Sequence, residues 1–213
     1  MSGLPSRGLY AIVDVGSLTS RGLDPLAFAE AVLDGGPALL QLRAKGLGSA
    51  DTLALLRALA PRCRARAVPL FANDRVDLAA LAGATGVHLG QTDLPLELAR
   101  RVAPECKVGV STHSRSQLLD ALARRPDYVA VGPVFTTQTK RDAEPVVGVE
   151  LVRRAVEVSD VPVVAIGGLD RERAVEVAKC GAIVAVIGAL LPDSGDLAEV
   201  THRTRSLRDA VGP

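Results

Sequence analysis

The 213-residue sequence predicts an α/β fold, a single-domain (β/α)8 TIM barrel, from three observations. Short apolar runs recur eight times, and helical patterns with capping residues lie between them. Most of these runs are continuously apolar, which is typical of parallel strands covered by helices. No shift in composition marks a second domain, so we expect one domain over residues 1–213. A doubly wound open sheet is the alternative, but it rarely needs eight comparable units.

Six of the eight predicted strands end at a polar residue, a glycine or a proline, where the barrel would open. The clearest stop is Gly132-Pro133, which follows the apolar run from Tyr128 to Val131. The eight predicted strands are Leu9–Val15, Leu39–Lys45, Val68–Asp74, Gly86–Gly90, Lys107–Thr112, Tyr128–Pro133, Pro162–Gly168 and Ile183–Leu190.

Capping residues mark the predicted helices between the strands. Asp24 followed by Pro25 is a helix start, and Gly35-Gly36 ends that helix. Asp170 and Gly181 bracket another helix in the same way. The helix between Asp170 and Gly181 is Arg171–Cys180, and the other predicted helices are Ala50–Leu59 with Ser49 as its cap, Val76–Leu81, Pro95–Val102, Ser116–Ala123, Val149–Val158 and Asp196–Val211.

The composition narrows the classes of function. Lys and Arg number 25 against 24 for Asp and Glu, so no basic excess indicates a nucleic-acid partner. No apolar run reaches the roughly 18 residues of a membrane span, and the start resembles no signal peptide. The three cysteines are widely spaced, which favours ordinary thiols over a metal site. We therefore expect a cytoplasmic protein, and the oligomeric state is left open, a homo-oligomer included.

Polar residues gather where the predicted strands end, which is where barrels of this type place their active sites. In the second strand the alternation puts Gln41, Arg43 and Lys45 on one side. Arg offers a planar fork of donors and Lys a point charge, so this side would grip phosphate oxygens. An exposed charged loop is the plainer alternative.

Two aspartates follow neighbouring strands. Asp74 ends the third strand and Asp93 follows the fourth, close to the predicted cations. Two carboxylates with water and substrate phosphate are a common Mg²⁺ site. Each aspartate could instead cap the helix that follows it, before Val76 or Pro95.

The later strands predict a second anion site. The sixth strand is followed by a threonine-rich segment, Val134–Lys140, and the seventh ends at Gly167-Gly168. Backbone N–H groups after the last two strands form the recurring phosphate site of this fold, which points to Gly168 and Gly188. Ser111, at the end of the fifth strand, would face a polar ring or a phosphate. His88 is predicted to be a satisfied barrel residue and His202 a solvent-facing one.

At these positions the sequence resembles the thiamine phosphate synthase (thiamine-phosphate pyrophosphorylase) family. The segments that carry the resemblance run in family order over nearly the whole chain. They are QLRAK (Gln41–Lys45), NDRVDLA (Asn73–Ala79), GVHLGQTD (Gly86–Asp93), GVSTHS (Gly109–Ser114), GPVFTTQTK (Gly132–Lys140) and AIGGL (Ala165–Leu169).

The resemblance implies a transferase that joins a hydroxymethylpyrimidine diphosphate to a thiazole phosphate, carboxylated or not, and releases pyrophosphate. The pyrimidine diphosphate ionises first in that family, and the thiazole nitrogen then captures the pyrimidine cation. The catalytic contribution would come from Arg43, Lys45, Ser111 and Lys140. The residues implied for the pyrimidine diphosphate are Gln41, Leu42, Arg43, Ala44, Lys45, Asn73, Ser111 and Lys140. Those implied for the thiazole phosphate are Thr137, Gln138, Thr139, Gly168, Ile187 and Gly188, and Asp74 and Asp93 would hold Mg²⁺.

The sequence departs from the family pattern near the eighth strand. Gly181-Ala182-Ile183-Val184 is one residue shorter than the common pattern, and Gly188 stands where serine is frequent. Two alternatives remain. A thiazole tautomerase of the same superfamily would use His113 for proton transfer, and a non-catalytic regulatory barrel would need only the monophosphate site. The presence of Asp93 and of residues 137–140 favours the synthase.

Overall fold

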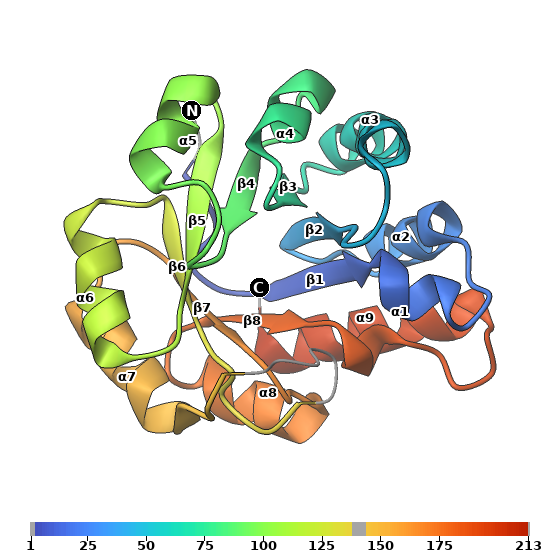
Figure 1. The fold of residues 1–213 in the computed structure, drawn as a ribbon. Helices are drawn as coiled ribbons and strands as arrows, with labels where there is room; N and C mark the ends of the chain where they lie inside the picture. The colour runs from blue at the N-terminus through green and yellow to red at the C-terminus, as the bar shows by residue number, and fades with distance from the viewer. Residues whose placement is uncertain (1–2, 138–143, 213) are drawn as a thin grey trace.

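The computed structural model describes residues 3–137 and 144–212 and folds as a closed barrel of eight parallel strands in sequential order (Figure 1). The strands are β1 (Leu9–Asp14), β2 (Leu39–Arg43), β3 (Leu70–Asn73), β4 (Gly86–Leu89), β5 (Lys107–Thr112), β6 (Tyr128–Val131), β7 (Val163–Ile166) and β8 (Ile183–Val186). β8 pairs with β1 and closes the sheet, so the predicted barrel is confirmed and the open-sheet alternative is wrong.

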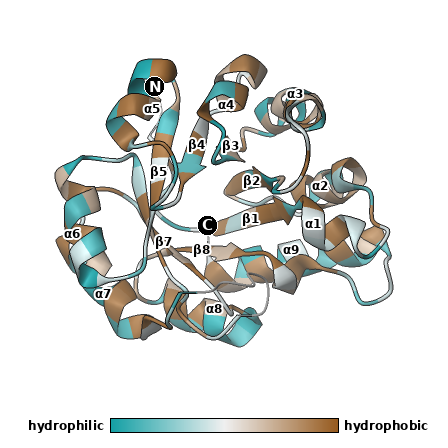
Figure 2. Ribbon diagram, viewed as in Figure 1, coloured by the Kyte–Doolittle hydropathy of each residue, from teal (hydrophilic) through white to brown (hydrophobic). Residues whose placement is uncertain are grey.

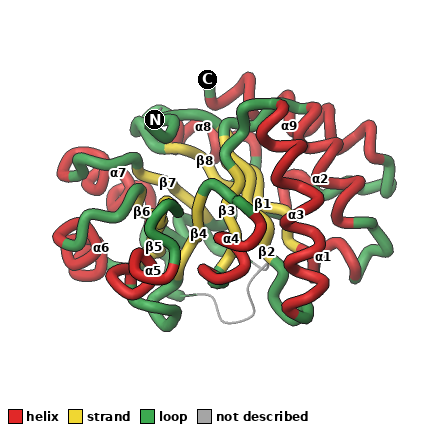
Figure 3. The backbone as a smooth tube through the Cα atoms, turned by 90° about the horizontal axis from the view of Figure 1, so that it is seen from above, coloured by secondary structure: helices red, strands yellow, loops and turns green. Residues whose placement is uncertain are grey.

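The helices surround the strands, as the view from above shows (Figure 3). They are α1 (Val15–Thr19), α2 (Pro25–Asp34), α3 (Ser49–Ala65), α4 (Val76–Ala82), α5 (Leu96–Val102), α6 (Arg115–Ala123), α7 (Gly148–Val158), α8 (Arg171–Ala178) and α9 (Leu197–Val211). α9 packs against both α2 and α8 and covers the seam where the barrel closes. Among the described residues no helix is long and apolar enough to cross a membrane.

The sequence placed the elements well but not all of their ends. The predicted caps Asp24 and Asp170 accept hydrogen bonds from Ala27 N and Arg173 N, as expected. The eighth strand ends at Val186 rather than Leu190, because the chain turns into a short 3₁₀ helix, Gly188–Leu190. Ile187 therefore precedes the 3₁₀ helix and Gly188 begins it, so the backbone N–H groups of both residues lie outside the sheet.

Apolar side chains form two layers on either side of the strands. The outer layer lies between strands and helices and contains most of the buried residues. Figure 2 shows the consequence: the strands are largely brown, whereas α6 and α8 carry teal residues as well as brown ones. The inner layer fills the barrel axis with Tyr10, Ile12, Leu39, Phe71, Tyr128, Ala130, Val164, Ile183 and Ala185.

Two glycines make room for the aromatic rings of the inner layer. A Cβ atom on Gly109 would lie 2.0 Å from Cζ of Tyr128, and one on Gly86 would lie 2.6 Å from Cε1 of Phe71. The rings of Tyr10, Phe71 and Tyr128 meet edge to face, with centroids 5.3–6.1 Å apart. Such aromatic pairs stabilise the fold by more than the apolar area they bury. We call these three rings the floor of the barrel, below the carboxyl ends of the strands.

Candidate active site

The mouth of the barrel begins with an ion pair between neighbouring strands. Asp14 ends β1, Arg43 ends β2, and the two are register partners whose side chains form a salt bridge. Asp14 also accepts from Ser17 N at 2.9 Å and from Ser17 Oγ at 2.6 Å. Only 5% of Asp14 and 15% of Arg43 are exposed. Arg43 is thus a fixed cation, and Asp14, which sequence reasoning did not identify, holds it there.

The structure brings Lys45, Asp74 and Asp93 together beside this pair. Lys45 Nζ lies 3.2 Å from Asp74 Oδ2, and Asp93 Oδ2 accepts from Gly90 N at 2.7 Å. Burial raises the pKa of Asp74, and the adjacent Asp93 carboxylate raises it further, while Lys45 lowers it. Carboxylates this close repel each other, and a cation between them would remove the repulsion.

The helix-cap alternative for these two aspartates is wrong. α4 begins after Arg75 and α5 after Pro95, and neither helix has a side-chain cap. Asp74 instead adopts a left-handed backbone conformation with φ of 63°. Non-glycine residues held in this region often belong to functional sites. The two aspartates therefore belong to the loops that follow β3 and β4, at the carboxyl ends of these strands.

Gln41, Asn73 and Ser111 lie on the inner side of the barrel between the floor and the mouth. Gln41 is 3% exposed and Ser111 is 9% exposed. Gln41 Nε2 donates to Tyr10 Oη at 2.9 Å, and Ser111 Oγ lies 2.8 Å from His88 Nε2. Asn73 ends β3, in register with His88.

The two neighbours of Arg43 in the chain, Leu42 and Ala44, do not direct their side chains to the mouth as polar ligands. Leu42 is buried in the outer apolar layer, so only its backbone is available to a guest in the mouth. Ala44 follows β2 and is partly buried against the same layer. Both remain predictions as substrate contacts.

The opposite side of the mouth is built from backbone. The segment after β6 runs along the end of β7, where Val134 N donates to Ile166 O at 2.9 Å and Phe135 N to Gly167 O at 3.0 Å. A Cβ atom on Gly168 would lie 2.4 Å from Thr136 O, and φ of Gly168 is +65°. Only glycine fits this close approach.

Arg173, on the first turn of α8, is a second residue that sequence reasoning missed. Its Nη1 donates to Gly168 O at 2.9 Å, and its guanidinium lies 4.8 Å from the centre of the Phe135 ring. Arg173 therefore clamps the end of β7 to the segment after β6. Thr137 lies in the described part of that segment, whereas Gln138, Thr139 and Lys140 lie outside the described residues.

The histidines occupy three different settings. Both ring nitrogens of His88 are hydrogen-bonded, so the prediction of a satisfied barrel residue is confirmed. His202 is exposed on α9, also as predicted. His113 Nδ1 lies 2.5 Å from Gly132 O, and its backbone N donates to Gln117 Oε1.

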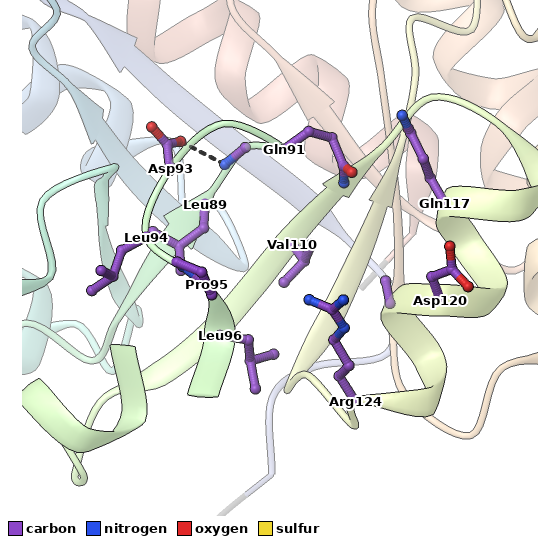
Figure 4. Close-up of a pocket in the computed structure, with 12 residues that line it drawn as sticks. Leu89, Gln91, Asp93, Leu94, Pro95, Leu96, Val110, Gln117, Asp120 and Arg124 are labelled. Atoms are coloured by element: carbon purple, nitrogen blue, oxygen red, sulfur yellow. Dashed lines mark hydrogen bonds between the residues drawn. The ribbon is translucent and has the colours of Figure 1, made fainter. Parts of the chain in front are cut away.

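A cleft of about 170 Å³ opens between α5 and α6, outside the ring of strand ends (Figure 4). Asp93 and Gln91 lie at one end of it, and Asp120 and Arg124 at the other. Gln91 Nε2 donates to Ser111 O at 2.5 Å, which ties the Asp93 loop to β5. The cleft shares Asp93 with the mouth but none of the predicted anion ligands Arg43, Lys45 or Gly168.

Comparison with known proteins identifies relatives of the whole barrel. The family model described as thiamine monophosphate synthase matches residues 9–190. A thiamine-phosphate synthase of Herpetosiphon aurantiacus is 44% identical over 86% of this chain and 88% of its own. One of Koribacter versatilis is 44% identical over 90% and 92%. The structure of a thiamine phosphate pyrophosphorylase from Pyrococcus furiosus covers 97% of this chain and 96% of its own, with a TM-score of 0.85 at 33% identity.

Proposed function

The chain belongs to the thiamine monophosphate synthase family, and from this premise we propose how its own residues perform the transfer. The reaction joins hydroxymethylpyrimidine diphosphate to a thiazole phosphate and gives thiamine phosphate and pyrophosphate. The C–O bond to the diphosphate breaks and the electron pair leaves with the diphosphate. The thiazole nitrogen then supplies the pair for the new C–N bond. No step removes a proton from carbon, so the site needs no strong general base.

The charged side of the mouth is proposed to bind the departing diphosphate. The observation that carries this assignment is the meeting of Arg43, Lys45, Asp74 and Asp93 at three adjacent strand ends. Arg43 is fixed by Asp14, so its fork is oriented before a ligand arrives. Preorganised donors of this kind stabilise the developing negative charge of a leaving group. Lys140 is proposed to add a further cation from outside the described residues.

Asp74 and Asp93 are proposed to hold Mg²⁺. Their hard oxygen donors suit the ion. The pKa of Asp74 is raised first by burial and then by the Asp93 carboxylate, and a bound cation would offset both effects. No group of three or more potential metal ligands occurs among the described side chains. Two carboxylates alone fit an ion that keeps waters and takes substrate phosphate oxygens. When bound, Mg²⁺ would neutralise charge on the leaving diphosphate.

The backbone side of the mouth is proposed to bind the thiazole phosphate. Gly168 and the turn at Ile187 and Gly188 follow the last two strands, the usual position of a phosphate site in barrels. Thr137, Gln138 and Thr139 would close over it from the segment after β6. Gln41, Asn73 and Ser111 are left for the pyrimidine ring between the two anion sites. The proposed setting is a cytoplasmic enzyme with small phosphorylated substrates and no nucleic-acid partner.

The test is to supply both phosphorylated substrates with Mg²⁺ or with EDTA and to follow pyrophosphate and thiamine phosphate. The proposal expects both products in equal amounts with the metal, and loss of both with EDTA. Folded protein that forms neither product would contradict it. Thiazole isomerisation should then be measured with wild type and with His113→Asn, because a tautomerase would depend on that ring. If the protein shows neither activity, the non-catalytic regulatory barrel is the remaining alternative, and binding of thiazole phosphate alone tests it.

A further inference from the structure

A chain of hydrogen bonds crosses the inside of the barrel and joins five strands. Gln41 Nε2 donates to Tyr10 Oη at 2.9 Å, and Tyr10 Oη lies 3.1 Å from Tyr128 Oη. Tyr128 Oη lies 2.8 Å from His88 Nδ1, and His88 Nε2 lies 2.8 Å from Ser111 Oγ. The two ends of the chain, Gln41 and Ser111, are thus two of the three side chains proposed to face the pyrimidine. Tyr10, Tyr128 and His88 have no role in the function proposed above.

The number of available protons fixes which group donates and which accepts in each hydrogen bond from Gln41 to Ser111. Burial raises the pKa of both phenols, so each keeps its proton. Tyr10 Oη accepts from Gln41, so its own proton has Tyr128 as its acceptor in the described structure. Tyr128 then donates to His88 Nδ1, and His88 carries its proton on Nε2 and donates to Ser111 Oγ. The reverse direction would leave the Tyr10 proton without an acceptor at a site that is 1% exposed.

The ends of the chain then present opposite polarity. Ser111 Oγ accepts from His88, so its hydroxyl proton can be donated to a guest. Gln41 uses its amide N–H in the chain, so its Oε1 can accept. The hydrogen bond of the Gln41 side chain to Tyr10 is made by Nε2, not by Oε1. Every fully buried side-chain nitrogen or oxygen in the described structure has a partner, so Oε1 is not fully buried.

We propose that Tyr10, Tyr128 and His88 are positioning residues that fix Gln41 as an acceptor and Ser111 as a donor. The identity of the guest as an aminopyrimidine rests on the proposed function. Such a ring carries a donor amino group beside an acceptor nitrogen, which complements an acceptor and a donor on the protein. Reversing either end would leave like groups opposed, at a cost comparable to a lost hydrogen bond.

Packing holds the chain in this geometry. The Tyr128 ring stacks on His88 at 5.6 Å with an interplanar angle of 12°, and it meets Tyr10 and Phe71 edge to face. Gly109 opens the space for that ring, since any Cβ atom there would overlap it. The hydroxyl and imidazole groups therefore have little freedom to reorient when a ligand binds.

The first measurement is the tautomer of His88 by ¹⁵N NMR at pH 7.5. The chain has three histidines, and His88→Gln assigns the signal. The proposal expects a proton on Nε2 alone in wild type. Tyr128→Phe removes the donor to Nδ1, so a second tautomer with the proton on Nδ1 should appear. Tyr10→Phe leaves that donor in place, so the wild-type tautomer should persist.

The second measurement is the Kd of the pyrimidine diphosphate by calorimetry without thiazole phosphate. Tyr128→Phe and Tyr10→Phe should each weaken binding about threefold to tenfold, the effect of a neutral hydrogen bond. Thiazole phosphate binding should change less than about twofold. Thr112→Val is the matched control, because it removes a buried hydroxyl that is not part of the chain: Thr112 Oγ1, on β5, donates to Ala130 O at 2.9 Å. It should leave the tautomer and both affinities unchanged.

The outcomes separate this inference from the proposed function. A His88 proton on Nδ1 or on both nitrogens in wild type would overturn the inference, as would Tyr128→Phe that is folded and binds the pyrimidine like wild type. Circular dichroism and thermal melting establish folding, and Tyr10→Phe supplies an independent test if Tyr128→Phe unfolds. A third outcome separates the two proposals. If wild type shows the expected His88 tautomer and the variants show the expected changes in Kd, but wild type forms no thiamine phosphate, the inference is supported and the synthase function is contradicted.

Discussion

The two sides of the barrel mouth are built from different materials. From β1 to β4 the strand ends carry charged side chains that already contact each other, in the pairs Asp14–Arg43 and Lys45–Asp74. From β6 to β8 the strand ends expose glycines and backbone groups. The backbone at Thr136 lies so close to Gly168 that Gly168 has no room for a side chain. One side offers formal charge and the other offers N–H groups.

This difference matches the two anions of the proposed reaction. In the proposed reaction the leaving diphosphate gains negative charge as its bond breaks, so the fixed cations and the metal proposed for that side would act on the transition state. The thiazole phosphate keeps its charge throughout, so its side only has to bind and orient it. Changes on the charged side should therefore affect turnover, and changes on the backbone side should affect the KM of thiazole phosphate.

Arg43→Ala should have the largest effect. It removes the fixed cation that Asp14 holds, and kcat/KM should fall by about 100-fold or more, mainly through kcat. Steady-state kinetics with each substrate varied in turn measure this. Arg153→Ala is the control, since Arg153 forms an exposed pair with Glu150 on α7 and should leave both constants unchanged. A near-normal kcat for Arg43→Ala would exclude Arg43 from leaving-group stabilisation.

Asp93→Asn should raise the Mg²⁺ concentration for half-maximal rate by at least about tenfold, because one of two carboxylates loses its charge. Asn keeps an oxygen that can accept from Gly90 N, so the loop should remain in place. A Mg²⁺ titration at saturating substrates gives the value, with Asp209→Asn on α9 as the control. An unchanged metal requirement removes Asp93 from the site.

Gly168→Ala should raise the KM of thiazole phosphate about tenfold and affect the pyrimidine diphosphate much less. It combines a positive φ with a Cβ atom 2.4 Å from Thr136 O, so the free energy of unfolding should fall by roughly 2–4 kcal/mol. Gly148→Ala is matched to it, with φ of +73° and open space, and should cost about 1–2 kcal/mol without a kinetic effect. Equal losses in both variants would show that the close approach is unimportant.

Gly188→Ser should have the smallest effect. It restores a hydroxyl that is frequent in the family at the start of the 3₁₀ helix, and the KM of thiazole phosphate should fall about threefold. The same kinetic assay measures it, with Gly3→Ser in open space before β1 as the control. If KM rises instead, the backbone N–H of this turn, unobstructed by a side chain, is the better ligand.

The site residues differ in how well the sequence could predict them. The sequence could predict the charged residues of the mouth, because the carboxyl ends of the strands form the active site in barrels of this type. These residues are Arg43, Lys45, Asp74 and Asp93. Asp14 has the same position at the end of β1, and only its pairing with Arg43 marks it. Gln138, Thr139 and Lys140 stay predictions.

The residues that sequence reasoning missed act through partners far along the chain. Tyr10 and Tyr128 are 118 positions apart, and each reads as one more apolar strand residue in its own segment. Their hydroxyl groups meet only when the barrel closes. Arg173 on α8 likewise contacts Phe135, which lies in the segment after β6.

The sequence by itself determined the eight strand–helix units, their order and the end of the barrel where charge collects, because periodicity and capping are local properties. The tertiary structure decided which groups bond to each other: which carboxylate holds Arg43, which way the protons run from Gln41 to Ser111, and where β8 ends. Those outcomes depend on distances of a few ångströms between residues from different strands, and closure of the barrel sets those distances.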